Sequence, residues 1–423
     1  MTVAGAFLGG ASGRLLPASV PLRFFGAAVV YHALGWLVLA IAPGNGLAFR
    51  GGLGWPLAAL HLFTLGVLGM TALGAAAQLL PVATRQAPVG ARALAWIWGL
   101  YTPGVAVLAL GMGLAMPPLL AIGGTAVAVA LATWATLVAT NLRRARGMPG
   151  VCTHAWSALL SLCVLLASAL LLAAGWLGWA VPGRQLTLPL HLLFAPFGFM
   201  GLLALGLSYL LVPMFALSQP PHEGTQLASC ACIVAALLLA ALAVFGVMPA
   251  VARALAWTLG STGVLLHLHL MRRALATGMR KELGRSFLLV KLAWGALLVT
   301  LVLGGLLWAG MDLPRAEAAF GLALLAWLLT FVFGMLQRIL PFLAALHAAA
   351  GKRRGPTASA LTHDKALKAH FCCHVTAFAG LALAIALDAE WLARPAAAIG
   401  FAGALAFGAF HLHLLRKLRA AGV

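Results

Sequence analysis

The sequence predicts an all-α polytopic membrane protein with about 12 transmembrane helices, arranged as three repeats of four, and with both termini in the cytoplasm. Three observations lead to this prediction. Of the 423 residues, 63% are hydrophobic and only 8% are charged, whereas soluble domains average about 25% charged residues. The apolar residues form long runs, and the Lys and Arg residues are concentrated in every second connection between these runs. One short motif recurs three times. An ordinary water-soluble domain is therefore excluded.

Twelve apolar runs have the length of a membrane span. A bilayer core about 30 Å thick requires roughly 20 helical residues. Cut at prolines, glycines and charge clusters, the runs predict spans near 22–43, 57–82, 92–114, 117–142, 155–180, 187–215, 225–248, 250–271, 286–310, 316–343, 368–388 and 394–415. Arg14 and Pro17 interrupt the weakly apolar start, so we expect no cleaved signal sequence. The spans predict a single transmembrane domain over residues 1–423.

The basic residues orient these spans. With the N-terminus inside, 21 Lys and Arg residues fall on the inner side and five on the outer side. Cytoplasmic loops of membrane proteins are enriched in Lys and Arg, so both termini are predicted to be cytoplasmic. The localisation that follows is a bacterial-type inner membrane, crossed many times, with the lipid bilayer as partner. The net charge of +20 is explained by this asymmetry, and nucleic acid is not a predicted partner.

A recurring motif predicts an internal repeat. Each copy is a glycine followed seven residues later by a proline, near the inner end of an even-numbered span, and a basic stop follows two spans later. We expect each proline to end its helix. The repeat units are approximately 22–147, 155–285 and 286–420. The three copies are Gly74-AAAQLL-Pro81, Gly206-LSYLLV-Pro213 and Gly334-MLQRIL-Pro341.

Histidines are the candidate functional groups inside the membrane, because all seven acidic residues fall at span ends or in loops. His61 and His191 open the second and sixth spans from the outer side, each with a methionine nine residues later, and His32 lies in the middle of the first span. Neutral imidazole is a common ligand of heme iron and copper. These three histidines are therefore candidate heme or copper ligands. The alternative is that each bonds a neighbouring backbone carbonyl.

A second candidate metal site lies where the eleventh span leaves the cytoplasm. His370 and His374 are four residues apart on one helical face, with Cys372 and Cys373 between them, a ligand set that suits a soft metal. The alternative is buried small cysteines beside solvated histidines. The pairs at 267–269 and 411–413 place their histidines on different helix faces, which predicts interfacial residues and no chelation.

The spans and the first of these histidines resemble subunit I of the heme–copper oxidase superfamily. The stretches His61-LFTLGVLGMTALGAAAQLLP and Gly198-FMGLLALGLSYLLVPMF are similar to the cbb-type branch and to the NnrS family of heme- and copper-containing membrane proteins linked to nitric oxide. The resemblance implies a low-spin heme ligand at His61 and a copper ligand at His191. It also implies two histidines on the tenth span and two on the seventh, and neither predicted span contains one.

The expected function is therefore an integral membrane protein that binds heme b, copper or both, in respiratory or nitric oxide redox metabolism, without a complete binuclear oxygen-reducing centre. Whether it is an enzyme is left open. Two alternatives remain: a transporter or permease for a neutral or hydrophobic solute, and a non-catalytic subunit whose Gly- and Ala-rich helix faces dock other membrane or respiratory subunits.

Overall fold

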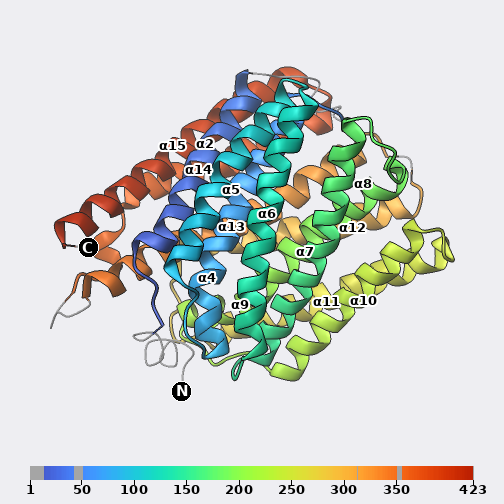
Figure 1. The fold of residues 1–423 in the computed structure, drawn as a ribbon. Helices are drawn as coiled ribbons and strands as arrows, with labels where there is room; N and C mark the ends of the chain where they lie inside the picture. Colours follow the sequence, from blue (N-terminus) through green and yellow to red (C-terminus); the bar gives the residue numbers. More distant parts are fainter. Residues whose placement is uncertain (1–13, 42–50, 312, 350–354, 423) are drawn as a thin grey trace.

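The computed structural model describes residues 14–41, 51–311, 313–349 and 355–422, and within them the chain forms helices and no strands (Figure 1). Twelve helical segments are long and apolar enough to cross a membrane, which confirms the predicted polytopic fold. They are α2 (Ser19–Ile41), α3–η1–α4 (Trp55–His61, Leu62–Gly69, Met70–Thr84), α5 (Ala91–Gly113), α6 (Pro117–Arg143), α7 (Pro149–Trp176), α8–η2–α9 (Arg184–Leu193, Phe194–Gly201, Leu202–Ala216), α10 (Glu223–Val244), α11 (Pro249–Thr277), α12 (Gly284–Trp308), α13 (Ala316–Ala349), α14 (Asp364–Leu387) and α15 (Glu390–Ala420). A short 3₁₀ turn, Ser359–Leu361, precedes α14.

The predicted spans agree with these helices to within a few residues. The clearest difference is at α7, which begins at Pro149 and not at 155. Proline is favoured in the first helical turn because its missing N–H has no helical partner there. Cys152 and His154, which the prediction left in a loop, therefore belong to the helix. Residues 42–43 of the first predicted span lie outside the described residues, as do Arg50 and the basic residues 352–354.

The prediction that the repeated prolines end their helices is wrong. Pro81 and Pro213 lie inside the last turn of α4 and α9, and Pro341 lies inside α13. The first two helices end four residues later, at Arg85 and Leu217, which both adopt the left-handed conformation. In both, the amide five residues after the proline donates to the proline carbonyl at 3.0 Å. The left-handed residue thus ends the helix, and the proline only removes one donor.

The helices pack as long antiparallel pairs. α5 with α6, α10 with α11, α12 with α13, and α14 with α15 share the most extensive contacts. Glycine permits this close approach: a Cβ added at Gly111 of α5 would lie 2.2 Å from the Leu120 nitrogen of α6. α15 also packs along α2, so that the first and last of the described helices lie side by side (Figure 1).

Two helices contain a π-helical turn at matching places. η1 (Leu62–Gly69) and η2 (Phe194–Gly201) each have eight residues and lie 132 residues apart, the same separation as Gly74 and Gly206. π-Helical turns are rare and often mark functional sites. His61 directly precedes η1, and His191 lies three residues before η2. Both π-helical segments therefore follow a histidine that the sequence analysis selected.

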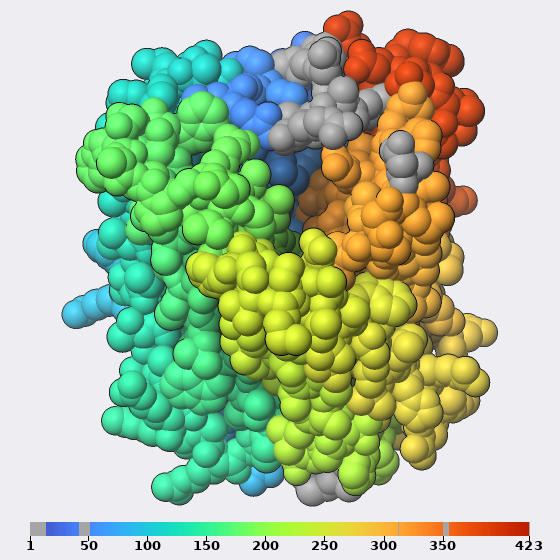
Figure 2. Space-filling view, turned by 90° about the vertical axis from the view of Figure 1, so that its right-hand side faces the viewer, coloured from blue at the N-terminus to red at the C-terminus, as the bar shows by residue number. Residues whose placement is uncertain are grey.

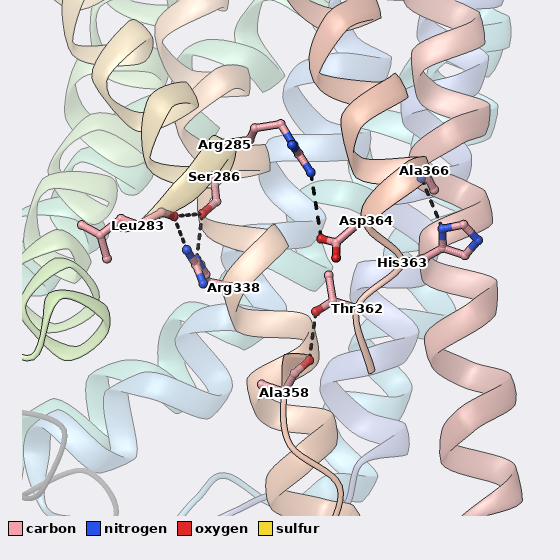
Figure 3. A network of polar contacts seen from close by, with 9 residues as sticks. All are labelled: Leu283, Arg285, Ser286, Arg338, Ala358, Thr362, His363, Asp364 and Ala366. Carbon is pink, nitrogen blue, oxygen red and sulfur yellow. Dashed lines mark hydrogen bonds and ion pairs between the residues drawn. The ribbon is translucent and has the colours of Figure 1, made fainter. Parts of the chain in front are cut away.

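A polar network joins one end of α12, α13 and α14 (Figure 3). The guanidinium of Arg338 on α13 donates to the hydroxyl of Ser286 at 2.7 Å and to the Leu283 carbonyl at the start of α12. Arg285 lies 4.0 Å from the carboxylate of Asp364 in the first turn of α14. Both side chains of this ion pair are largely exposed, so it adds little stability. Of the helices that this network joins, α14 carries two of the three histidines described next.

Candidate metal centre

Three buried histidines from two distant parts of the chain converge inside the bundle. One ring nitrogen each from His32, His370 and His374 lies within 4.8 Å of the others. His32 is on α2, whereas His370 and His374 lie one turn apart on the same face of α14. All three side chains are at most 2% exposed. The separation suits three ligands around one ion, since zinc and copper sites place imidazole nitrogens about 2 Å from the metal.

Each imidazole uses one nitrogen in a hydrogen bond. Trp36 donates its indole N–H to Nε2 of His32 at 2.9 Å. Nε2 of His374 lies 2.9 Å from the Thr330 hydroxyl, and Nδ1 of His370 lies 3.3 Å from the Gln337 amide. The Thr330 hydroxyl can accept a ring N–H, as the outer partners of metal-binding histidines do, whereas the indole of Trp36 and the amide nitrogen of Gln337 only donate.

The other nitrogen of each ring is buried and has no hydrogen-bond partner among the described residues. These atoms are Nδ1 of His32, Nε2 of His370 and Nδ1 of His374. An unsatisfied buried polar atom costs about 1–3 kcal/mol. Three such atoms on rings that converge indicate that this group lacks a ligand.

Aromatic rings enclose the three histidines. The ring centre of Phe333 lies 4.1 Å from that of His32 and 5.1 Å from that of His370, and Phe407 lies 4.9 Å from His370. Phe378 stacks at 5.0 Å on His374. Every Asp and Glu among the described residues is exposed, so no carboxylate shares this space. A bound ion would therefore be surrounded by neutral ligands and hydrocarbon.

The Trp36 bond determines which tautomer His32 adopts. An indole N–H only donates, so Nε2 of a neutral His32 accepts and Nδ1 carries the proton. A metal on Nε2 displaces the indole. A metal on Nδ1 moves the proton to Nε2, where two N–H groups then face each other. By either route, binding a metal at His32 breaks the hydrogen bond from Trp36.

The two cysteines between His370 and His374 are not part of this cluster. Cys372 is exposed on α14, and Cys373 is half-buried with its Cβ against Gly403 of α15. Cys372, two residues after His370, lies on another helix face, and Cys373 contacts Gly403 and is absent from the group of converging ligand atoms. The structure thus brings together the two histidines of the predicted soft-metal site but replaces its thiols with His32.

The predicted ligands His61 and His191 lie beside each other. Their ring centres are 6.4 Å apart and their planes differ by 27°. Nδ1 of His61 lies 3.0 Å from the Leu57 carbonyl, and Nδ1 of His191 is buried with no hydrogen-bond partner among the described residues. His32 instead converges with His370 and His374.

An apolar cavity of about 140 Å³ opens on the side of the bundle, between α10, α11, α12 and the η2 region. Figure 2 shows this side of the molecule, with a hollow bordered by the green, yellow and orange segments. Phe197, Trp257, Phe320 and Trp327 line the cavity, and no histidine does. It therefore holds no ligand for a metal.

Sequence reasoning missed the partners of the three histidines. Trp36 follows His32 by one helical turn, a spacing that is visible in the sequence. Thr330 and Gln337 lie on α13, and no spacing in the sequence relates them to α14.

No protein-family model matches the chain, and no curated protein is similar to it.

Proposed function

We propose that this protein is an integral membrane copper protein that binds a monovalent copper ion between His32, His370 and His374. The observation that carries the proposal is the convergence of three buried imidazoles: one nitrogen of each ring lies within 4.8 Å of the others, and one nitrogen of each ring has no hydrogen-bond partner among the described residues. Thr330 on α13 can serve as an outer partner of His374, because its hydroxyl can accept the ring N–H of a metal-bound imidazole.

The surroundings favour a monovalent ion. Moving an ion from water into an apolar medium costs tens of kcal/mol by idealised solvation estimates, and the cost rises steeply with charge. No buried carboxylate is present among the described residues to neutralise a divalent ion. Imidazole binds copper well. Cu(I) therefore fits this site better than Zn²⁺ or Fe²⁺.

Copper held by these three imidazoles would be able to take a small neutral gas molecule as a further ligand. This chemistry agrees with a role in respiratory or nitric oxide metabolism without a second metal next to the first. In this chain, Phe333 and Phe407 exclude water from the histidines, and Thr330 and Gln337 orient the α14 rings.

Anaerobic titration of the purified protein with Cu(I) against a chromophoric chelator tests the proposal. His370→Ala and His374→Ala should each weaken copper binding at this site by tenfold or more, and Cys372→Ser, exposed on the same helix, should not change it. X-ray absorption should report nitrogen ligands at about 2 Å. Copper affinity unchanged in both histidine variants would contradict the proposal, and a metal-free protein would favour a transporter or a non-catalytic subunit.

A second candidate, a heme b protein, rests on His61 and His191. Two imidazoles that bind one iron from opposite sides, at about 2 Å each, have ring centres roughly 6 Å apart. The observed separation is 6.4 Å. A Soret absorbance band that is lost in both His61→Ala and His191→Ala would support this candidate. Full heme content in both variants, or a colourless protein, would exclude it.

We also propose that the chain consists of three four-helix units with both termini in the cytoplasm of a bacterial-type cell. Gly74, Gly206 and Gly334 each approach the first helix of their own unit, at Phe24, His154 and Val290, within 3.0 Å of an added Cβ. The third and fourth helices of each unit pair extensively. Reporter fusions after residues 147 and 283 should both report the cytoplasm, and an external signal at either would contradict this arrangement.

A further inference from the structure

A second group of buried polar side chains lies in the middle third of the chain, on helices that carry none of the three histidines above. His154 on α7, Tyr209 on α9 and His267 on α11 are each 0% exposed. The ring centre of Tyr209 lies 5.3 Å from that of His154 and 5.1 Å from that of His267. The sequence analysis expected His267 to be interfacial, and the structure buries it.

This group has more unsatisfied polar atoms than a packed core tolerates. Nδ1 of His154 lies 2.8 Å from the Gly150 carbonyl, which leaves Nε2 with a free lone pair. Nε2 of His154, the hydroxyl of Tyr209 and both nitrogens of His267 have no hydrogen-bond partner among the described residues. An imidazole with neither nitrogen bonded is rare in a protein interior and calls for a missing ligand.

The backbone is shaped to bring these side chains together. A Cβ added at Gly206 on α9 would lie 2.6 Å from Cβ of His154, so only glycine lets α9 approach α7 this closely. On α11, Gly263 lies one turn before His267, and its carbonyl accepts a 2.7 Å hydrogen bond from Ser229 of α10. Ser229 thus fixes α11 against α10 at the level of the group.

We propose that His154 and His267 form a second metal site beside the ring of Tyr209, which binds a monovalent copper ion through the two imidazoles. His154 is already in the tautomer that a metal ligand needs, since its Nδ1–H donates to a backbone carbonyl and its Nε2 has a free lone pair. No buried carboxylate is present among the described residues, so a divalent ion would lack neutralising charge here as well.

Copper stoichiometry in the full-length protein tests the site. Anaerobic Cu(I) titration should give two ions per chain. His154→Ala and His267→Ala should each reduce this to one, and His269→Ala, which changes an exposed histidine on the same helix, should leave two. His370→Ala should remove the other ion, and His267→Ala combined with His370→Ala should abolish binding.

The variants separate this site from the proposed function. If the wild-type protein binds a single ion that His267→Ala abolishes and His370→Ala retains, the second site is correct and the first is wrong. If His154→Ala and His267→Ala both keep the wild-type stoichiometry, the group encloses water and this proposal fails. Should an alanine variant fold poorly, His154→Gln and His267→Gln can be used instead, because glutamine keeps a similar side-chain volume and a polar amide group. Each should lose the same ion, and retention of that ion overturns the proposal.

Discussion

Trp36→Phe should strengthen copper binding at the His32 site while weakening the fold. The variant removes the indole N–H, which donates to Nε2 of His32 at 2.9 Å and must release it when His32 binds a metal. A net hydrogen bond is worth about 0.5–1.5 kcal/mol. Since about 1.4 kcal/mol corresponds to tenfold in affinity, Trp36→Phe should bind Cu(I) roughly threefold to tenfold more tightly.

The same substitution should lower thermal stability. The indole is 1% exposed, and its ring packs directly on Gly400 of α15 and on Phe63. Loss of part of a buried ring typically costs about 1–3 kcal/mol. Affinity and stability are therefore expected to change in opposite directions, which a general loosening of the protein would not produce.

The assay is an anaerobic Cu(I) titration with a competing chelator, combined with a melting curve in detergent. Trp134→Phe is the matched control, because Trp134 is also 1% exposed but its indole N–H has no hydrogen-bond partner among the described residues. It should lose stability and keep wild-type affinity. Equal or weaker copper binding in Trp36→Phe would refute the reasoning, since it would mean that the loaded His32 keeps its indole bond.

Two further predictions concern an outer partner of the site and the helix packing. Thr330→Val keeps the shape but removes the hydroxyl next to Nε2 of His374, so Cu(I) affinity should fall about tenfold or more; wild-type affinity would show that the hydroxyl does not orient the ring. Gly111→Ala places a methyl group 2.2 Å from the α6 backbone and should lower the melting temperature strongly. Gly99→Ala meets no atom within 4 Å and should be neutral or slightly stabilising; similar melting temperatures for the two variants would contradict the packing.

The sequence predicted the helices well because a bilayer imposes a local rule. Each span must be long, apolar and internally hydrogen-bonded, and these properties can be recognised within 20 to 30 consecutive residues. Helix ends were predicted less well. Pro81 and Pro213 were expected to end their helices, whereas the left-handed residues Arg85 and Leu217 do so. That conformation depends on the loop that follows, and neither Arg nor Leu is a residue type from which a left-handed conformation is predicted.

The candidate sites were predicted only in part. The sequence selected His61 and His191, which lie 6.4 Å apart, and all three members of the candidate metal centre. It assigned His32 to the wrong neighbours, because hydropathy does not reveal which helices touch. His267 was predicted to be interfacial and His154 was not assigned a role, since neither has a metal-ligand spacing within its own helix.

The sequence by itself thus determined the class of protein, the number of spans and the placement of the acidic residues at span ends or in loops, since all of these follow from local composition. Only the tertiary structure decided that α2 meets α14 and that α7, α9 and α11 enclose a common polar group. His32 and His370 are 338 residues apart in the chain, and their approach depends on the packing of every helix between them. That packing is set by the fit of side chains and glycines across many helix pairs, and a one-dimensional pattern does not contain it.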